Sequence, residues 1–218
     1  SFMASFDFNK LIGNVYTGLL IEGFYTVLQN PFVNEIGEPD ENGRVLYTRK
    51  NADKGALVKG VNIELKLKPL RGFSLTSGFT LQSSKYDVVQ QFNKREFFRT
   101  PSDYGYMNLD WDFIRNVCLS STLTYTGKMF VPYFGPLAYN PDTGELHRTD
   151  SFLDMGCKLS YNIKANGSSL RLFAGLKNIF NSYQPDFDTG IDRDPAYIYG
   201  PISPRTVYFG ICIGNNLK

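Results

Sequence analysis

Apolar and polar residues alternate with a period of two along most of this sequence. The pattern is clearest in six ranges: 61–68, 73–82, 107–113, 117–129, 153–163 and 207–213. Because successive side chains of a β-strand point to opposite faces, this period indicates strands with one apolar and one polar face. The sequence contains no convincing amphipathic helical range that competes with them, so we expect an all-β protein.

The connections between the expected strands alternate in length. We expect about nine strands, over 2–9, 14–29, 44–69, 72–87, 104–114, 116–132, 150–165, 168–180 and 204–214. Short connections fall at 10–13, 70–71, 115 and 164–167, and long ones fall at 30–43, 88–103, 133–149 and 181–203. In an up-and-down sheet, the short turns then share one end and the long loops the other, as in outer-membrane barrels. The sequence therefore predicts a segment of a transmembrane antiparallel β-barrel, which starts at the long-loop end.

The composition agrees with strands that face two different environments. The 218 residues include 18 Phe, 14 Tyr and 20 Gly, yet the mean hydropathy is only −0.24. A net charge of +2 provides no basic surface, so we expect no nucleic-acid partner. No apolar run reaches the roughly 18 residues of a membrane-spanning helix.

A soluble β-sandwich is the alternative fold, because its strands also alternate apolar and polar residues. Several expected strands are much longer than the roughly 5–6 residues usual in such proteins. The regular alternation of connection lengths also favours the barrel, as do polar positions rich in Ser, Thr, Asn and Gly. Monodisperse solubility without detergent would favour the sandwich.

Six segments occur in an order that matches a known family. They are Lys59–Leu65, Thr76–Ser84, Phe98–Pro101, Tyr125–Gly127, Leu176–Tyr183 and Tyr199–Ile211. The set resembles the C-terminal barrel of TonB-dependent receptors, the outer-membrane importers of iron chelates, cobalamin and related scarce nutrients. The most specific segment is Leu-Lys-Asn-Ile-Phe-Asn-Ser-Tyr at 176–183. The range 186–201 further resembles the subgroup of cobalamin and iron-chelate receptors.

The resemblance implies that residues 1–218 are the C-terminal portion of a barrel of about 22 strands in the bacterial outer membrane. Its partners would be outer-membrane lipid, a small nutrient ligand, and a plug domain and N-terminal strands that precede this range. TonB would act through the plug, and no covalent step is implied, so we expect a transporter and not an enzyme. The sequence ends at 214–218 without the terminal aromatic of most barrels, and we expect the natural N-terminus to lie upstream.

The same resemblance assigns structural roles to a set of motif residues. They are Gly60, Asn178, Phe180, Tyr183, Gly200, Pro201 and Arg205. Asn178 and Arg205 flank the longest loop, where we expect packing and hydrogen-bonding roles. Arg205 either faces the lumen and pairs with Asp110, Asp112 or Asp154, or is solvated at the base of the loop.

Two aromatic pairs in the long loops are the best candidates for contacting a ligand or closing the mouth of the barrel. They are Tyr133 with Phe134, and Tyr197 with Tyr199.

Four aspartates surround Gly190 with the spacing of a calcium loop. They are Asp186, Asp188, Asp192 and Asp194. Hard cations take several oxygen ligands in such turns, but an EF-hand needs a glutamate where this sequence has Tyr197. The alternatives are therefore a Ca²⁺ site, which would be the one cofactor of this chain, and a solvated acidic loop.

Motifs for catalysis are lacking in this sequence. It contains no GxSxG, no Cys–His pairing and no Gly-rich phosphate loop. The single histidine, His147, is the one candidate for an outer-membrane barrel enzyme, although a lone loop histidine is usually solvated. Active nutrient uptake is the predicted function, and a passive pore, a barrel enzyme and a soluble β-sandwich binding module are the alternatives.

Overall fold

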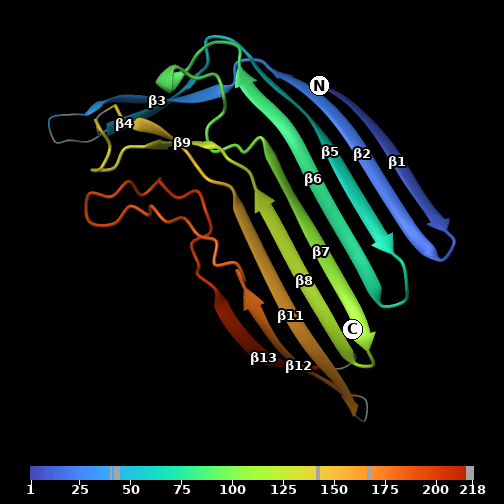
Figure 1. The fold of residues 1–218 in the computed structure, drawn as a ribbon. Helices are drawn as coiled ribbons and strands as arrows, with labels where there is room; N and C mark the ends of the chain where they lie inside the picture. Colours follow the sequence, from blue (N-terminus) through green and yellow to red (C-terminus); the bar gives the residue numbers. More distant parts are fainter. Residues whose placement is uncertain (40, 42–44, 141–142, 166–167, 215–218) are drawn as a thin grey trace.

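A single nine-stranded antiparallel sheet dominates the computed structural model, which describes residues 1–39, 41, 45–140, 143–165 and 168–214 (Figure 1). Its strands are β1 (Phe2–Ile12), β2 (Val15–Leu28), β5 (Ala56–Lys68), β6 (Phe73–Tyr86), β7 (Asp103–Ile114), β8 (Val117–Thr126), β11 (Phe152–Ala165), β12 (Ser168–Lys177) and β13 (Thr206–Gly214). Each strand pairs with the next one along the chain, which confirms the predicted up-and-down antiparallel topology.

Four shorter strands and a 3₁₀ turn lie in the long connections. β3 (Phe32–Pro39) pairs with β4 (Val45–Asn51), β9 (Phe130–Tyr133) pairs with β10 (Glu145–Arg148), and η1 covers Gln91–Asn93. The expected strands 44–69 and 116–132 are therefore each interrupted. Residues 52–55 separate β4 from β5, and 127–129 separate β8 from β9. Alternation does not reveal these breaks, because the hairpin strands continue the same period.

Short turns and long connections lie at opposite ends of the sheet, as predicted (Figure 1). Gly13, Gly72 and Asn116 in the short turns have φ of 60°, 76° and 67°. This left-handed region is accessible to Gly and tolerated by Asn, which explains why two-residue and four-residue turns close here. The chain starts at the end with the long connections. Residues 166–167 of the predicted turn at 164–167, and the predicted tail at 215–218, lie outside the described residues.

One face of the sheet is apolar across all nine strands, and we call it the apolar face. The cross-strand registers align rows of apolar side chains, such as Phe6–Ile21–Ile63–Phe79 and Tyr161–Leu172–Ile211. No described segment covers this face: the side chains of Ile63 and Phe79 in the middle of the sheet are 43% and 42% exposed. The apolar alternation seen in the sequence therefore points to one continuous, open surface.

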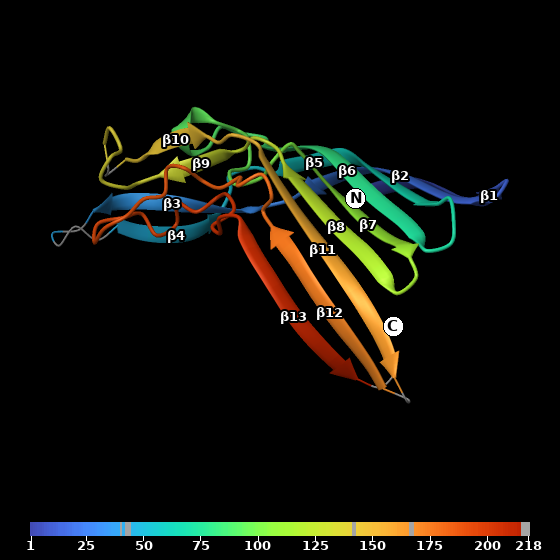
Figure 2. The same cartoon turned by 60° about the horizontal axis from the view of Figure 1, so that its bottom comes forward.

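The opposite face, which we call the polar face, carries hydrogen-bonded side chains. The Asn62 amide donates to Glu22 at 3.2 Å and its oxygen accepts from Thr80 at 2.9 Å, while the Tyr106 hydroxyl donates to Glu64 at 2.8 Å. The strands are twisted and the sheet bends across them (Figure 2), as expected for part of a barrel wall.

A glycine on β5 permits the close packing of this polar face. A Cβ at Gly60 would contact the Leu81 carbonyl oxygen and lie 2.6 Å from the Phe24 ring. We expect Gly60→Ala to lower the free energy of unfolding by about 1–3 kcal/mol, because a strand or the ring must shift. Gly23→Ala is the matched control, since the nearest atom to its Cβ, the Ala4 carbonyl oxygen, lies 4.0 Å away. Guanidinium unfolding in lipid vesicles measures both, and equal effects would contradict the packing argument.

Candidate functional site

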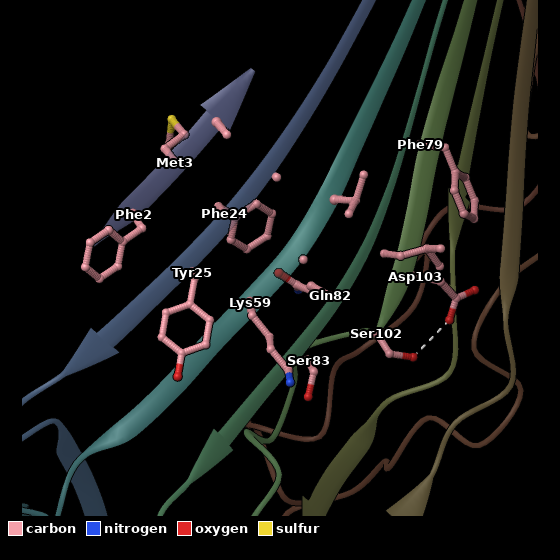
Figure 3. A pocket seen from close by; sticks show the side chains of 15 residues that line it. Phe2, Met3, Phe24, Tyr25, Lys59, Phe79, Gln82, Ser83, Ser102 and Asp103 are labelled. Atoms are coloured by element: carbon pink, nitrogen blue, oxygen red, sulfur yellow. Dashed lines mark hydrogen bonds between the residues drawn. The ribbon is translucent and has the colours of Figure 1, made fainter. Parts of the chain in front are cut away.

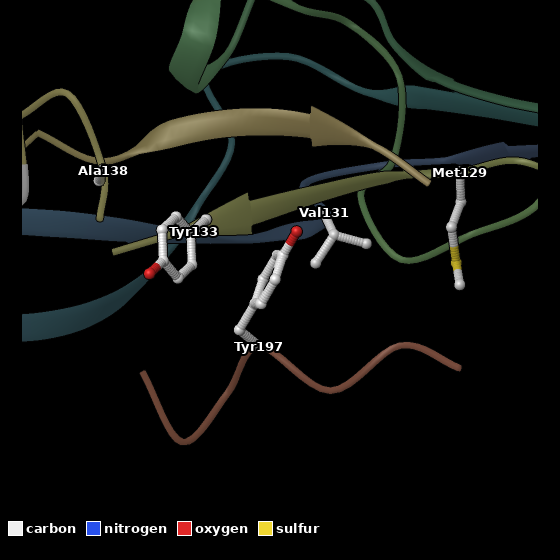
Figure 4. Packing of buried hydrophobic residues seen from close by; sticks show 5 residues of the cluster. All are labelled: Met129, Val131, Tyr133, Ala138 and Tyr197. Carbon is white, nitrogen blue, oxygen red and sulfur yellow. The ribbon is translucent and has the colours of Figure 1, made fainter. Parts of the chain in front are cut away.

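The long connections pack together around a small apolar core, which we call the mouth cluster. Its buried members are Met129, Val131, Tyr133, Ala138 and Tyr197, with Tyr199 packed against them. In Figure 4, Tyr133 on β9 and Tyr197 from the connection between β12 and β13 lie beside one another, and their ring centroids are 4.5 Å apart. The mouth cluster therefore joins the β9–β10 hairpin to the connection 178–205.

Asn178 closes the base of the connection 178–205. Its side-chain amide donates to the carbonyl oxygens of Ser182 and Ser203 at 3.0 and 2.8 Å, and its oxygen accepts from the Ser182 N–H at 2.8 Å. The residue is 3% exposed and has a φ of 48°, which Asn tolerates better than most residues. The structure therefore gives Asn178 the hydrogen-bonding role that was expected of it.

Gln184 holds the middle of the same connection. Its side chain is 1% exposed, its amide donates to the Tyr197 carbonyl oxygen at 3.0 Å, and its oxygen accepts from the Tyr199 N–H at 3.0 Å. The two arms of the connection are thus bridged by one buried amide. Gly200 allows this packing, because a Cβ there would lie 2.8 Å from the Phe152 ring and 3.2 Å from the Gln184 Cβ.

A chain of hydrogen bonds links Asp186 to β10. Tyr199 and Tyr197 donate their hydroxyl protons to the two Asp186 oxygens at 2.5 and 2.8 Å. The Tyr197 oxygen also lies 2.6 Å from His147 Nδ1, and His147 Nε2 lies 2.6 Å from Glu145 Oε1. We call these five residues the mouth latch. His147 was expected to be solvated, as a lone loop histidine usually is; its side chain is 36% exposed, and both ring nitrogens also have protein partners.

The mouth latch shifts the acidity of its members. Burial alone would raise the pKa of the Asp186 carboxyl, but the hydrogen bonds from Tyr199 and Tyr197 outweigh it and lower that pKa. The hydrogen bond from His147 lowers the pKa of Glu145. Burial, followed by the hydrogen bond to Asp186, raises the pKa of both tyrosines, Tyr197 and Tyr199. Both carboxyls are therefore held ionised and both phenols protonated.

A cavity of about 440 Å³ opens beside the mouth cluster, and we call it the mouth pocket. Its volume is within the range of roughly 300–1,000 Å³ found for small-molecule sites. Its aromatic lining consists of Phe32, Tyr86, Phe97, Phe98 and Phe134. Its charged lining consists of Arg49, Arg99 and Asp194. Such a lining suits a ligand that combines flat rings with negative charge.

Arg99 adopts a strained backbone at the wall of the mouth pocket. Its φ is 55°, in a region that costs of order 1–3 kcal/mol for a residue of this kind. Its N–H donates to the Phe130 carbonyl oxygen at 2.7 Å, and its guanidinium donates to the Ile198 carbonyl oxygen at 3.1 Å. These contacts hold the strained residue in place, and they connect the mouth pocket to the connection 178–205.

A larger hollow, of about 890 Å³, lies on the sheet itself (Figure 3). It lies mainly on the apolar face of β1, β2, β5 and β6, where Ala4 and Gly23 leave space between the side chains of Phe2, Tyr25 and Leu81. Its lining is mostly apolar, and none of the charged residues of the mouth pocket belongs to it. We therefore regard this hollow as a shallow depression between side chains of the apolar face. The mouth pocket is the candidate site.

The predicted aromatic pairs both lie at the mouth, but in different settings. Phe134 lines the mouth pocket, where its ring centroid is 6.1 Å from that of Phe92. Tyr133 and Tyr197 are 4% and 2% exposed, so they form the packing that supports the pocket. Tyr199 packs on the same cluster. Direct ligand contact by these residues remains a prediction.

The predicted calcium ligands are already engaged in the protein or point to solvent. Asp188 accepts the Asp194 N–H at 2.7 Å, and Asp194 accepts the N–H groups of Phe134 and Ala196 at 3.0 and 2.9 Å. Asp192 is exposed. Among the residues that the structure describes, no three His, Cys, Asp or Glu side chains form a group that could hold a metal ion. The calcium site stays a prediction without structural support.

The remaining motif residues lie around the base of the connection 178–205. Phe180 and Tyr183 are 53% and 48% exposed, and the Pro201 carbonyl oxygen accepts the Gln184 N–H at 3.3 Å. The Arg205 side chain is exposed and forms no ion pair with any described residue. Of the two alternatives for Arg205, the structure therefore agrees with a solvated side chain at the base of the loop and not with a pairing to Asp110, Asp112 or Asp154. The backbone N–H of Arg205 donates to the Asn181 side-chain oxygen at 3.0 Å.

Sequence reasoning did not identify Gln184, Glu145, Arg49 or Arg99 as site residues. Gln184 and Arg99 each fall inside or beside a family-like segment, which is the only signal that could have selected them. Arg99 contacts Ile198 on a connection distant in sequence, which no periodicity encodes. Glu145 contacts its near neighbour His147 on the same strand.

No described helix is long and apolar enough to cross a membrane.

Solved structures match this chain over almost its whole length. It is similar to the closed form of Fiu, the ferric-catecholate import receptor of E. coli K12, with 18% identity, a TM-score of 0.62, and coverage of 97% of this chain and 26% of Fiu. It is similar to the ferric enterobactin receptor PfeA of Pseudomonas aeruginosa in complex with enterobactin, with 18% identity, a TM-score of 0.59, and coverage of 96% and 30%. It is also similar to the siderophore receptor PirA of Acinetobacter baumannii, with 17% identity, a TM-score of 0.57, and coverage of 96% of this chain and 30% of PirA.

These likenesses establish the fold. The nine-stranded antiparallel sheet matches part of the barrel of TonB-dependent siderophore receptors, as the sequence predicted. The chain spans between 26% and 30% of the length of the three receptors. No protein-family model and no curated protein matches the sequence.

Proposed function

We propose that this chain is the C-terminal wall of an outer-membrane, TonB-dependent transporter that imports an anionic iron chelate bearing aromatic rings. The observation that carries the proposal is the combination of one uncovered apolar face with a charged, aromatic pocket at the long-connection end. The barrel fold shared with siderophore receptors supports the same reading.

The apolar face calls for a lipid environment. A soluble protein rarely exposes an apolar patch larger than a few hundred Å², whereas this face runs across all nine strands. Every buried apolar residue among those described lies toward the long-connection end: Ala52, Ala56, Met129, Val131, Tyr133, Ala138, Phe152 and Tyr197. In a barrel wall, lipid would solvate the apolar face and water would solvate the polar face.

The two edge strands of the sheet, β1 and β13, each have one side without a strand partner among the described residues. β1 and β13 each pair with a single neighbour in this chain, and unpaired backbone groups are costly in lipid. We propose that the preceding strands of the same receptor close the barrel against these edges and that a plug domain fills it. TonB would act on that plug.

The mouth pocket accounts for the class of ligand. Arg49 and Arg99 supply positive charge at its wall, and five aromatic rings supply flat apolar surface. An iron chelate with aromatic donor groups offers both flat rings and negative charge, whereas a neutral sugar offers no charge to pair with the arginines. Import then needs only binding at the mouth and a pull on the plug, without a covalent step.

Uptake of labelled iron tests this function. We expect bacteria whose only iron-chelate receptor is the complete protein to accumulate ⁵⁵Fe from a tris-catecholate complex, and to lose accumulation but not surface binding when tonB is deleted. Arg49→Gln should raise the Kd about 10- to 100-fold, the loss expected for a charged hydrogen bond of about 1.5–3 kcal/mol.

Arg71→Gln is the matched control, because Arg71 is an exposed arginine in a short turn at the opposite end of the sheet. It should bind the chelate as tightly as the unmodified protein does. Accumulation that persists without TonB would favour a passive pore. Absence of both binding and accumulation for catecholate and hydroxamate complexes alike would refute the proposed ligand class.

A further inference from the structure

Two small residues leave a depression on the apolar face near the long-connection end. Ala4 on β1 lies directly opposite Gly23 on β2, and the same row continues through Val61 on β5 to Leu81 on β6. The rows on either side carry larger side chains: Phe2–Tyr25–Lys59–Ser83 and Phe6–Ile21–Ile63–Phe79. The hollow of about 890 Å³ lies over the small residues between these rows. Its apolar floor and sides suit a flexible hydrocarbon chain.

The hollow has a positive charge at its long-connection end. Lys59 and Ser83 are direct cross-strand partners, and Figure 3 shows them beside Tyr25 at the edge of the hollow. Both follow the apolar residues of their strands at intervals of two, so they lie on the apolar face. Lys59 is exposed and forms no ion pair with any described residue.

A polar pocket of about 320 Å³ continues the hollow, and we call it the rim pocket. The two cavities share Gln82, Ser83 and Ser102. The charged lining of the rim pocket consists of Lys85, Lys128, Arg148 and Glu96. Asp103, which lines the hollow, already accepts the hydroxyl protons of Ser102 and Tyr125 at 3.0 and 2.7 Å. An apolar volume is therefore joined directly to a volume rich in cations.

The cations of the rim pocket remain able to bind an anion. Lys85 pairs with Glu96 at 3.1 Å and Lys128 pairs with Asp150 at 3.3 Å, and both lysine side chains are 50% exposed. Such exposed ion pairs are weak, so a phosphate can compete for these lysines. Arg148 is exposed and forms no ion pair with any described residue. Together the two cavities therefore provide two cations without an acidic partner.

We propose that this end of the apolar face binds one phosphate-bearing membrane lipid, with an acyl chain in the hollow and the phosphate between Lys59 and the rim pocket. An anionic lipid has an apolar part joined directly to a charged part, as these cavities do. A lipid without net charge would leave the cations unpaired, and a free phosphate ion would leave the hollow unfilled. The inference rests on the proposed function, because it requires the apolar face to meet a membrane.

Native mass spectrometry of the complete protein in detergent tests the charged part of the site. Dioleoyl phosphatidic acid and dioleoyl phosphatidylcholine are titrated separately, because they have the same chains and differ in net charge. We expect phosphatidic acid to bind more tightly. Lys59→Gln should weaken its binding about fivefold, and Lys59→Gln with Arg148→Gln about 25-fold, while phosphatidylcholine binding stays the same. Lys10→Gln is the matched control, because Lys10 is exposed on the same face at the short-turn end.

A second variant tests the apolar part of the site. Gly23→Leu should fill the hollow and weaken the binding of both lipids at least about tenfold, because the acyl chain loses burial of several methylene groups. The strand accommodates the side chain, since the atom nearest to a Cβ at Gly23 lies 4.0 Å away. Ala174→Leu adds the same bulk to the apolar face of β12 and should leave binding unchanged. Heat-modifiable migration on gels checks that each variant is folded.

Three results would overturn the proposal. The first is equal affinity for the two lipids, or a preference that survives both cation replacements. The second is competition by inorganic phosphate as effective as that by phosphatidic acid, which would show binding of the ion alone. The third is a protein dimer that forms in place of the lipid complex and is lost in Gly23→Leu, which would identify a second copy as the occupant.

Iron accumulation separates failure of this site from failure of the proposed function. The unmodified protein and the lipid-site variants are assayed for TonB-dependent accumulation of ⁵⁵Fe. Normal accumulation without any preference for phosphatidic acid would refute the lipid site alone. Absence of accumulation by the unmodified protein would refute the proposed function on which the site depends.

Discussion

If the apolar face meets lipid, as we propose, replacement of Leu123 by arginine is expected to lower the free energy of unfolding by about 2–4 kcal/mol. Leu123 lies in the middle of β8 on the apolar face, directly opposite Met107 on β7 and Met155 on β11. In the proposed barrel wall, an arginine there would place a guanidinium among lipid chains, where it loses hydration and has no partner.

Thr122→Arg provides the matched control, because Thr122 is the adjacent residue on the same strand. Its side chain is exposed on the polar face, opposite Asn108 and Gly156. If this face meets water, the arginine remains hydrated and the cost should stay below about 1 kcal/mol. The pair therefore tests the orientation of the wall at one depth.

Guanidinium titration of the protein in lipid vesicles measures both variants. Equal destabilisation by the two variants would show that the two faces meet the same environment, which would contradict the barrel proposal. A soluble sandwich would bury Leu123 in protein and also penalise its replacement, so a second readout is needed. Spin labels at Leu75 and Leu81 on the apolar face should respond to a lipid-soluble quencher, and labels at Thr76 and Thr80 to a water-soluble one.

The sequence predicted the wall of the molecule well for a physical reason. Each main-sheet strand must present apolar side chains on one face only, so the alternation around Phe79 or Leu159 encodes the orientation of a strand without knowledge of its neighbours. The turn residues Gly13 and Asn116 mark the short connections by their left-handed conformation. Local chemistry therefore determines both the strands and their order.

The mouth could be predicted only in part, because its contacts join segments distant in sequence. The hairpin β9–β10 continues the alternation of β8, so its departure from the sheet at 127–129 has no periodic signal. His147 was expected to be a solvated lone histidine, yet one of its ring nitrogens lies 2.6 Å from the hydroxyl of Tyr197, which comes from the distant connection 178–205. Such pairings appear only when the fold has brought the connections together.

Asn178 connects the end of strand β12 in the main sheet to the connection 178–205 at the mouth. It directly follows β12, and its side chain makes three hydrogen bonds to backbone groups at both ends of the connection 178–205. Removing them leaves buried donors and acceptors unpaired, at a cost of about 1–3 kcal/mol each. The strands themselves keep all of their cross-strand pairing.

Asn178→Ala is therefore expected to destabilise the connection locally by about 3 kcal/mol, or roughly 100-fold in amide exchange, while exchange in β12 and β13 stays slow. Asn178→Gly is the informative comparison, because it loses the same bonds but accepts the φ of 48° without strain. It should exchange more slowly than the alanine variant, by the roughly 1 kcal/mol that the left-handed region costs. Hydrogen exchange of residues 179–184 and 203–206 gives the comparison. Protection equal to that of the unmodified protein in both variants would show that the mouth holds its shape without this residue.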